Sequence, residues 1–151
     1  MLIAIDPGVK GGIVIRHSDE KTKGYKMPIN IERFFNSIPG LSRYKVYIEN
    51  VTGYFGKNLP SSRIGVLCEN YGYLKGFLEA SGATVNTVRP QKWMKMLGMK
   101  REKWETKTRW KWRLKEEAVF RFPNNKKEIT LATADAFLIL KYGMIQEGIF
   151  T

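Results

Sequence analysis

The sequence contains one cysteine, Cys68, and one histidine, His17, among its 151 residues. A single cysteine cannot close a disulfide within the chain, so a disulfide scaffold is excluded and a reducing compartment, the cytoplasm, is favoured. There is no Ser-His-Asp set, no zinc-ligand spacing and no Walker A loop. The sequence therefore argues against triad hydrolases, zinc sites and P-loop nucleotide chemistry.

Long hydrophobic runs are also missing. The longest, such as 46–48 and 136–140, are far shorter than a membrane span, so no membrane partner is expected. No basic leader precedes the strand-like N-terminus, which argues against a signal peptide. With no internal repeat and 43% hydrophobic residues, the chain is expected to form a single domain over 1–151 with its own core.

Acidic residues are few compared with basic ones: 14 Asp and Glu stand against 26 Lys and Arg, for a net charge of +12. The excess is regional, because residues 89–127, called the basic segment below, hold 14 of the basic residues and only four acidic ones. The same segment contains all four tryptophans of the chain. Cations neutralise phosphates and exposed aromatic rings stack on bases, so this composition favours a nucleic-acid partner.

The basic segment has a second interpretation, a solvated helix with a tryptophan-lined core face. Trp93 is more typical of a core than of a base-stacking residue, while Trp110 and Trp112 cannot both face one side of a helix, so at least one should point outward. The candidate DNA-binding cations are Arg89, Lys92, Lys100, Arg101, Lys103, Lys107, Arg109, Lys111, Arg113 and Lys115.

Hydrophobic periodicity and turn residues predict an α/β fold. Strands are expected over 1–5, 11–16, 23–27, 44–49 and 83–88, and helices over 31–38, 62–81, 90–97, 106–122 and 131–142. Asn30, Ser62, Thr106 and Thr130 are the expected helix caps. The first three strands, joined by tight turns, should form an antiparallel meander within a mixed five-stranded sheet that has helices on both faces.

Three acidic residues occur where acids are costly. Asp6 and Glu49 each end an apolar strand, and Asp135 interrupts a small, apolar run. Buried carboxylates are usually paired or bound to a cation, and neighbouring strands would bring Asp6 and Glu49 to one sheet edge under the last helix. The sequence thus predicts an all-oxygen site for Mg²⁺ or Mn²⁺, and two such ions would suit phosphodiester hydrolysis.

The same motifs resemble a known family in order along the chain. The segment 3–13, with its Asp-Pro-Gly turn, resembles the opening strand and turn of the RuvC-type Holliday junction resolvases. The segment 47–51 resembles their second acidic strand, and 134–143 resembles their closing Asp-Ala helix. Parts of the basic segment, including Arg89-Pro90 and Phe122-Pro123, resemble the family as well.

This resemblance implies an RNase H-like fold, a homodimer, and metal-dependent cleavage of four-way DNA junctions by Asp6, Glu49 and Asp135. The short chain is more similar to phage or viral members, which would act in the cytoplasm of a bacterial host. Gly72 and Gly76, four residues apart on one expected helix, suggest either a dimer contact or close packing against the sheet.

The sequence departs from the family pattern at two positions. Ala132 stands where the family commonly has a second acid or a histidine, so a fourth metal ligand is absent or comes from elsewhere. Glu128 would share the face of Asp135 if the helix began early, although a solvated position with its lysine neighbours is the simpler expectation. Thr52 stands where bacterial members carry an aromatic wedge.

Tyr54 and Phe55 follow closely and are the candidate wedge, unless they only pack the loop. Lys107 matches a family lysine that lies near the cleaved phosphate, or it is one more surface cation. Two alternatives to a junction resolvase stay open: a less selective RNase H-like nuclease acting on branched DNA or RNA–DNA hybrids, and a non-catalytic junction-binding protein.

Overall fold

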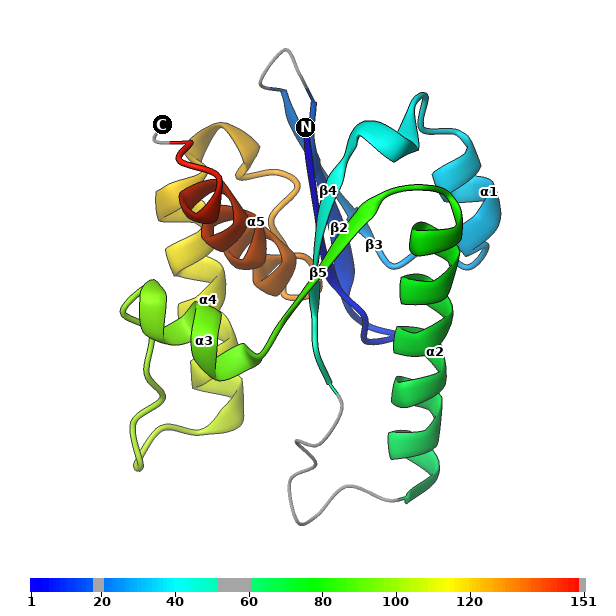
Figure 1. The fold of residues 1–151 in the computed structure, drawn as a ribbon. Helices are drawn as coiled ribbons and strands as arrows, with labels where there is room; N and C mark the ends of the chain where they lie inside the picture. Colours follow the sequence, from blue (N-terminus) through cyan, green and yellow to red (C-terminus); the bar gives the residue numbers. More distant parts are fainter. Residues whose placement is uncertain (18–20, 52–60, 150–151) are drawn as a thin grey trace.

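A computed structural model of the chain describes residues 1–17, 21–51 and 61–149 (Figure 1). Five strands form one sheet in the order β3-β2-β1-β4-β5. The strands are β1 (Leu2–Asp6), β2 (Gly12–Arg16), β3 (Thr22–Lys26), β4 (Lys45–Glu49) and β5 (Thr84–Val88). β1, β2 and β3 are antiparallel neighbours, whereas β4 runs parallel to both β1 and β5. The predicted RNase H-like mixed sheet with its antiparallel meander is confirmed.

Helices cover both faces of the sheet (Figure 1). They are α1 (Ile31–Asn36), α2 (Ser61–Ala80), α3 (Pro90–Met96), α4 (Lys107–Arg121) and α5 (Ala134–Gln146), with short 3-10 turns η1 (Leu41–Arg43) and η2 (Pro123–Asn125). Alternate side chains of the strands supply the two cores, as expected for a pleated sheet. In β1, Ile3 and Ile5 pack on the α1–α2 side, and Leu2 and Ala4 on the α3–α5 side.

Two of the expected helix caps are confirmed. The Asn30 side chain accepts from the backbone N–H of Arg33 at 2.7 Å, and Thr106 Oγ1 accepts from that of Arg109 at 3.1 Å. Ser62, in contrast, lies inside α2, which already contains Ser61.

The last helix begins later than expected, so Thr130 is not its N-cap, although its Oγ1 accepts from the N–H groups of Ala132 and Thr133 at 3.2 and 3.3 Å. The segment 130–133 is a turn closed by its own side chains, since Thr133 Oγ1 accepts from the Thr130 N–H at 2.8 Å and donates to the Glu128 carbonyl at 2.7 Å. α5 therefore begins only at Ala134, one residue before Asp135, and runs on to Gln146.

The glycines of α2 do not pack against the sheet. Gly72 and Gly76 are exposed, and a Cβ atom built on either would meet nothing within 4 Å. The opposite face of the helix, with Tyr71, Leu74 and Leu78, is the buried one. The open glycine face leaves the predicted dimer contact as a hypothesis. In the parts of the chain described here, no helix combines the length and apolarity needed to cross a bilayer.

Candidate active site

Asp6 and Glu49 end two adjacent parallel strands. The register of β1 and β4 pairs Ile5 with Ile48, so the residues that follow, Asp6 and Glu49, emerge at the same edge of the sheet. The turn after Asp6 fixes its side chain, because the Gly8 N–H donates to Oδ1 at 3.2 Å. The same turn requires Gly11, since a Cβ there would lie only 2.2 Å from the Asp6 carbonyl oxygen.

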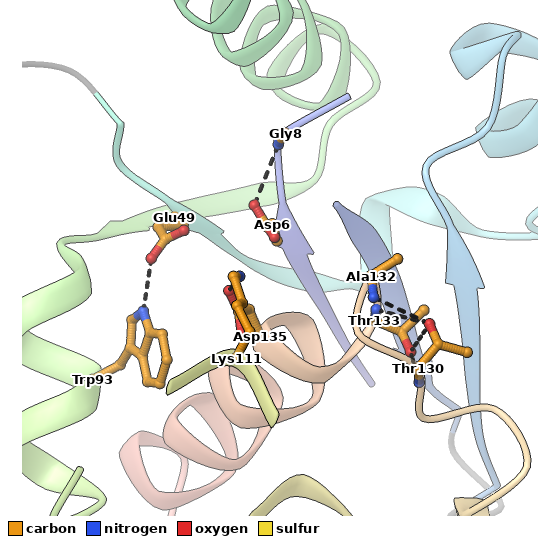
Figure 2. A network of polar contacts seen from close by, with 9 residues as sticks. All are labelled: Asp6, Gly8, Glu49, Trp93, Lys111, Thr130, Ala132, Thr133 and Asp135. Carbon is orange, nitrogen blue, oxygen red and sulfur yellow. Dashed lines mark hydrogen bonds and ion pairs between the residues drawn. The ribbon is translucent and has the colours of Figure 1, made fainter. Parts of the chain in front are cut away.

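Asp135 reaches this edge from α5, which packs against β1. Its position in the first turn of the helix is set by the 130–133 turn, and the residue is buried, with 7% exposure. Figure 2 shows Asp135 between Asp6 and Glu49, with Lys111 beside it. The structure thus brings together the three carboxylates that the sequence singled out.

The three carboxylates interact electrostatically. Burial, then repulsion from Asp135, raises the pKa of Asp6 to about 6, although Lys111 and the Gly8 N–H act in the opposite direction. Burial, then repulsion from Asp6, raises the pKa of Glu49 to about 8. Negative neighbours thus help to raise the pKa values of Asp6 and Glu49, so the site has an excess of negative charge that a cation would relieve.

Lys111 of α4 supplies one cation to this cluster. Its ammonium lies 2.5 Å from Oδ2 of Asp135. Burial lowers the pKa of Lys111, but attraction to Asp135, Asp6 and Glu49 outweighs burial, and the net pKa is raised. Sequence reasoning placed Lys111 among the DNA-binding cations and missed this role. A signal was available, since Lys111 lies one helical turn after Lys107, which the motif comparison had already placed near the site.

Trp93 forms a hydrogen bond with Glu49. Its ring is fully buried, and its indole Nε1–H donates to Oε1 of Glu49 at 3.0 Å (Figure 2). This bond favours the ionised form of Glu49 and works against the effect of burial on its pKa. The expectation that Trp93 is a core residue is confirmed, and its hydrogen bond adds a positioning role that the sequence did not reveal.

The donor set fits a hard divalent cation by its chemistry. All three side chains offer carboxylate oxygens, the ligands that Mg²⁺ and Mn²⁺ prefer. Oδ1 of Asp135 is buried and has no hydrogen-bond partner, an arrangement that is rare unless another ligand completes it. As they stand, however, the described residues include no group of three His, Cys, Asp or Glu side chains placed to bind one ion. The Lys111 ammonium occupies the place beside Asp135.

Two further sequence hypotheses concern the surroundings of Asp135. Ala132 lies in the 130–133 turn and contributes no ligand atom. Glu128 is half-buried and hydrogen-bonded to the edge of the sheet: Oε2 accepts from the Gly24 N–H of β3 at 2.8 Å and from Asn125 Nδ2 at 3.2 Å. Glu128 therefore stabilises the edge strand β3 and does not serve as a fourth carboxylate ligand.

The predicted DNA-binding cations divide into two groups. Those with exposed side chains are Arg89, Lys92, Lys100, Arg101, Lys103, Lys107 and Arg109, while Lys111, Arg113 and Lys115 are half-buried. Arg113 pairs with the buried Glu105 at 3.2 Å and lies over the ring of Trp110. Arg101 donates two hydrogen bonds to the Glu105 carbonyl. Arg113 and Arg101 therefore help to fold the segment between α3 and α4.

The tryptophans also divide into buried and exposed side chains. Trp110 is buried at 7% exposure, whereas Trp104 and Trp112 are 72% and 48% exposed. The expectation that Trp110 and Trp112 face different ways is confirmed. Tyr54 and Phe55, the candidate wedge, lie outside the described residues, so that role stays a prediction from the sequence.

No protein-family model matches the chain, and a search of curated proteins finds no match either. The resemblance to junction resolvases therefore rests on the ordered motifs alone.

Proposed function

We propose that the chain is a divalent-metal-dependent endonuclease that resolves four-way DNA junctions as a homodimer in the cytoplasm. One observation carries the proposal: Asp6, Glu49 and Asp135, from three separate motifs, meet at one edge of the sheet, where negative neighbours help to raise the pKa values of Asp6 and Glu49. Clusters of buried carboxylates with shifted pKa values are typical of catalytic centres.

Asp6, Glu49 and Asp135 would hold Mg²⁺ or Mn²⁺. When bound, such ions supply an activated water and stabilise the leaving oxygen of a phosphodiester. Lys107 supports this role, because it lines the same cavity as Glu49 and Asp135 and its exposed side chain is free to approach a phosphate oxygen. The exposed cations around the cavity favour binding of DNA over a small neutral substrate.

A homodimer follows from the symmetry of the proposed substrate. Two symmetrical nicks in a four-way junction need two active sites related by a two-fold axis. The open face of α2 around Gly72 and Gly76 is the proposed contact, because no atom of the described part of the chain lies within 4 Å of a Cβ built there and a second backbone could approach closely.

The decisive experiment is incubation with a synthetic mobile four-way junction and Mg²⁺ or Mn²⁺, beside a linear duplex of the same sequence. Junction cleavage should be lost in Asp6→Asn, Glu49→Gln and Asp135→Asn, with junction binding largely retained, since affinity comes from phosphate neutralisation elsewhere. Glu116→Gln, which removes an exposed carboxylate of α4, is the matched control and should cleave normally.

The other outcomes identify the alternatives. Equal cleavage of junctions, flaps and RNA–DNA hybrids would indicate the less selective nuclease. Tight junction binding without cleavage in either metal would indicate the non-catalytic binding protein, for which Ala132 and the Lys111–Asp135 pair provide a structural reason. Full activity of Asp6→Asn would refute the site assignment.

A further inference from the structure

A cavity of about 800 Å³ opens directly beside the carboxylate cluster. One wall is α3 with the segment that follows it, and the other wall is α4. Glu49 and Asp135 line the cavity at the end where it meets the cluster. Its volume is within the range of pockets that take a small organic group, so a stacked duplex arm would not fit inside.

The walls of this cavity are apolar. Met94 and Met99 line it and are partly buried against the core, and the buried Leu114 and Trp110 line the α4 side. Methionine adapts to flat aromatic groups, and its sulfur contacts them favourably. The interior of the cavity therefore suits a planar, largely apolar ring rather than a phosphate or a sugar.

The mouth of the cavity is basic. Lys95, Lys100 and Lys107 line it with exposed side chains. Among the residues that the structure describes, the carboxylates that line the cavity are Glu49 and Asp135, at its inner end. An apolar interior with cations around the opening complements a ligand that carries a flat ring on an anionic backbone.

The wall between α3 and α4 is held in shape before any ligand arrives. Glu105, 3% exposed, pairs with Arg113 at 3.2 Å and accepts from the Glu102 N–H at 3.2 Å. Gly98 takes a left-handed conformation, with φ of 71°, where the chain leaves α3. A wall braced in this way is preorganised, which lowers the entropic cost of binding.

We propose that this cavity takes one unpaired nucleotide of the DNA beside the phosphodiester to be cut. The inference rests on the proposed function and adds to it a means of selecting branched DNA. Phosphate contacts are the same on all duplexes, whereas a base leaves its stack at low cost only where pairing is already interrupted. A base seated between Met94, Met99 and Trp110 would distinguish a junction from ordinary duplex.

The test compares binding of a duplex that carries one unpaired nucleotide with binding of the fully paired duplex, in EDTA so that nothing is cleaved. The parent chain should prefer the bulged duplex by about tenfold or more, as expected for one stacked base. Met94→Asp, which places a charge in the cavity, should abolish that preference. Met96→Asp is the matched control, because Met96 lies on the same helix, is 43% exposed and does not line the cavity.

Met99→Asp repeats the test at a second position, and thermal melting establishes that each variant is folded. Preference for the bulged duplex in folded Met94→Asp or Met99→Asp would overturn the pocket. Junction cleavage by the parent, measured in parallel, tests the proposed function separately. If the parent cleaves junctions but does not prefer the bulged duplex, the nucleotide pocket is refuted and the proposed function is not. If Met94→Asp loses the preference of the parent for the bulged duplex but the parent cleaves no substrate, the proposed function is refuted and the pocket is not.

Discussion

The ammonium of Lys111 lies 2.5 Å from Oδ2 of Asp135, so the candidate active site already contains a cation of its own. That ammonium partly neutralises Asp6 and Glu49 as well as its direct partner. A divalent ion bound to Oδ1 of Asp135, which has no hydrogen-bond partner, would lie close to this ammonium and be repelled by it. Lys111 therefore stabilises the metal-free protein and competes with metal.

The first prediction follows from this competition. At about pH 8, Lys111→Met should bind Mn²⁺ severalfold more tightly than the parent, because the competing charge is gone. The metal-free variant should also melt at a lower temperature, since Asp135 is left buried without its partner. Calorimetric titration and thermal melting measure the two effects. Lys107→Met, one helical turn away and exposed, is the control, and an equal gain in Mn²⁺ affinity there would contradict the prediction.

The second prediction concerns pH. Because the folded-state pKa values of Asp6 and Glu49 are raised above those of the unfolded chain, the folded state holds more protons. The contribution of these two groups to the stability of the metal-free protein is then fully present below their unfolded pKa values, near 4, and is lost as pH rises through about 6 and 8. Glu49→Gln removes the larger part of this effect.

Urea unfolding in EDTA at about pH 5 and pH 8.5 tests the difference between the parent and Glu49→Gln. The variant should gain on the order of 1–3 kcal/mol relative to the parent as pH rises across this range. Comparing the two proteins cancels the contribution of titrating groups away from the cluster. A parent that gains stability relative to the variant would show that Glu49 is not destabilised by its surroundings.

The third prediction uses the turn after Asp6. Gly11→Ala should lower the free energy of unfolding by about 1–3 kcal/mol and reduce cleavage, because the new methyl group cannot fit beside the Asp6 backbone. Gly8→Ala is the matched control. A Cβ at Gly8 would lie 3.5 Å from Asp6 Oδ1, an ordinary contact, so this variant should keep both stability and activity. Normal activity in Gly11→Ala would show that the turn does not position Asp6.

The fourth prediction concerns salt. Lys92 and Lys103 are exposed, and each that contacts a phosphate should contribute about 0.9 to the slope of log K against log salt. The double variant Lys92→Gln, Lys103→Gln should therefore show a shallower slope on duplex arms. Lys23→Gln, Lys26→Gln on β3 removes the same charge outside the basic segment and should leave the slope unchanged. An equal decrease in slope in both double variants would indicate general electrostatic attraction between the chain and DNA rather than binding at a defined surface.

The sequence predicted the sheet and the meeting of the three acids at one sheet edge for a physical reason, while their role in metal binding stays a prediction. The side chain of an acid that ends a fully apolar strand lies at the end of that strand, and adjacent parallel strands end at the same edge of the sheet. Asp6 and Glu49 could therefore be paired before any coordinates were known. Asp135 was recognisable because an acid within a small, apolar run is costly to bury alone.

What the sequence could not show depends on how α4 is rotated against the sheet. Lys111 and Arg113 are two residues apart in a run of similar cations, yet one enters the carboxylate cluster and the other pairs with Glu105. Composition treats them alike, because only tertiary packing decides which cation meets which acid. The start of α5 was missed for a related reason. The side chains of Thr130 and Thr133 each accept a hydrogen bond from the other residue's backbone N–H and so form a turn before the helix. The spacing of the two threonines in the sequence does not show which of them precedes the first helical residue.

The arrangement of α5 against β1 also has a consequence in time. Asp6 lies on β1 and Asp135 on α5, so the ribosome makes Asp6 and Glu49 well before Asp135. The cluster therefore closes only when α5 has been made and has docked on β1. For a nuclease, such an order of assembly would keep a nascent chain inactive until that point in its synthesis.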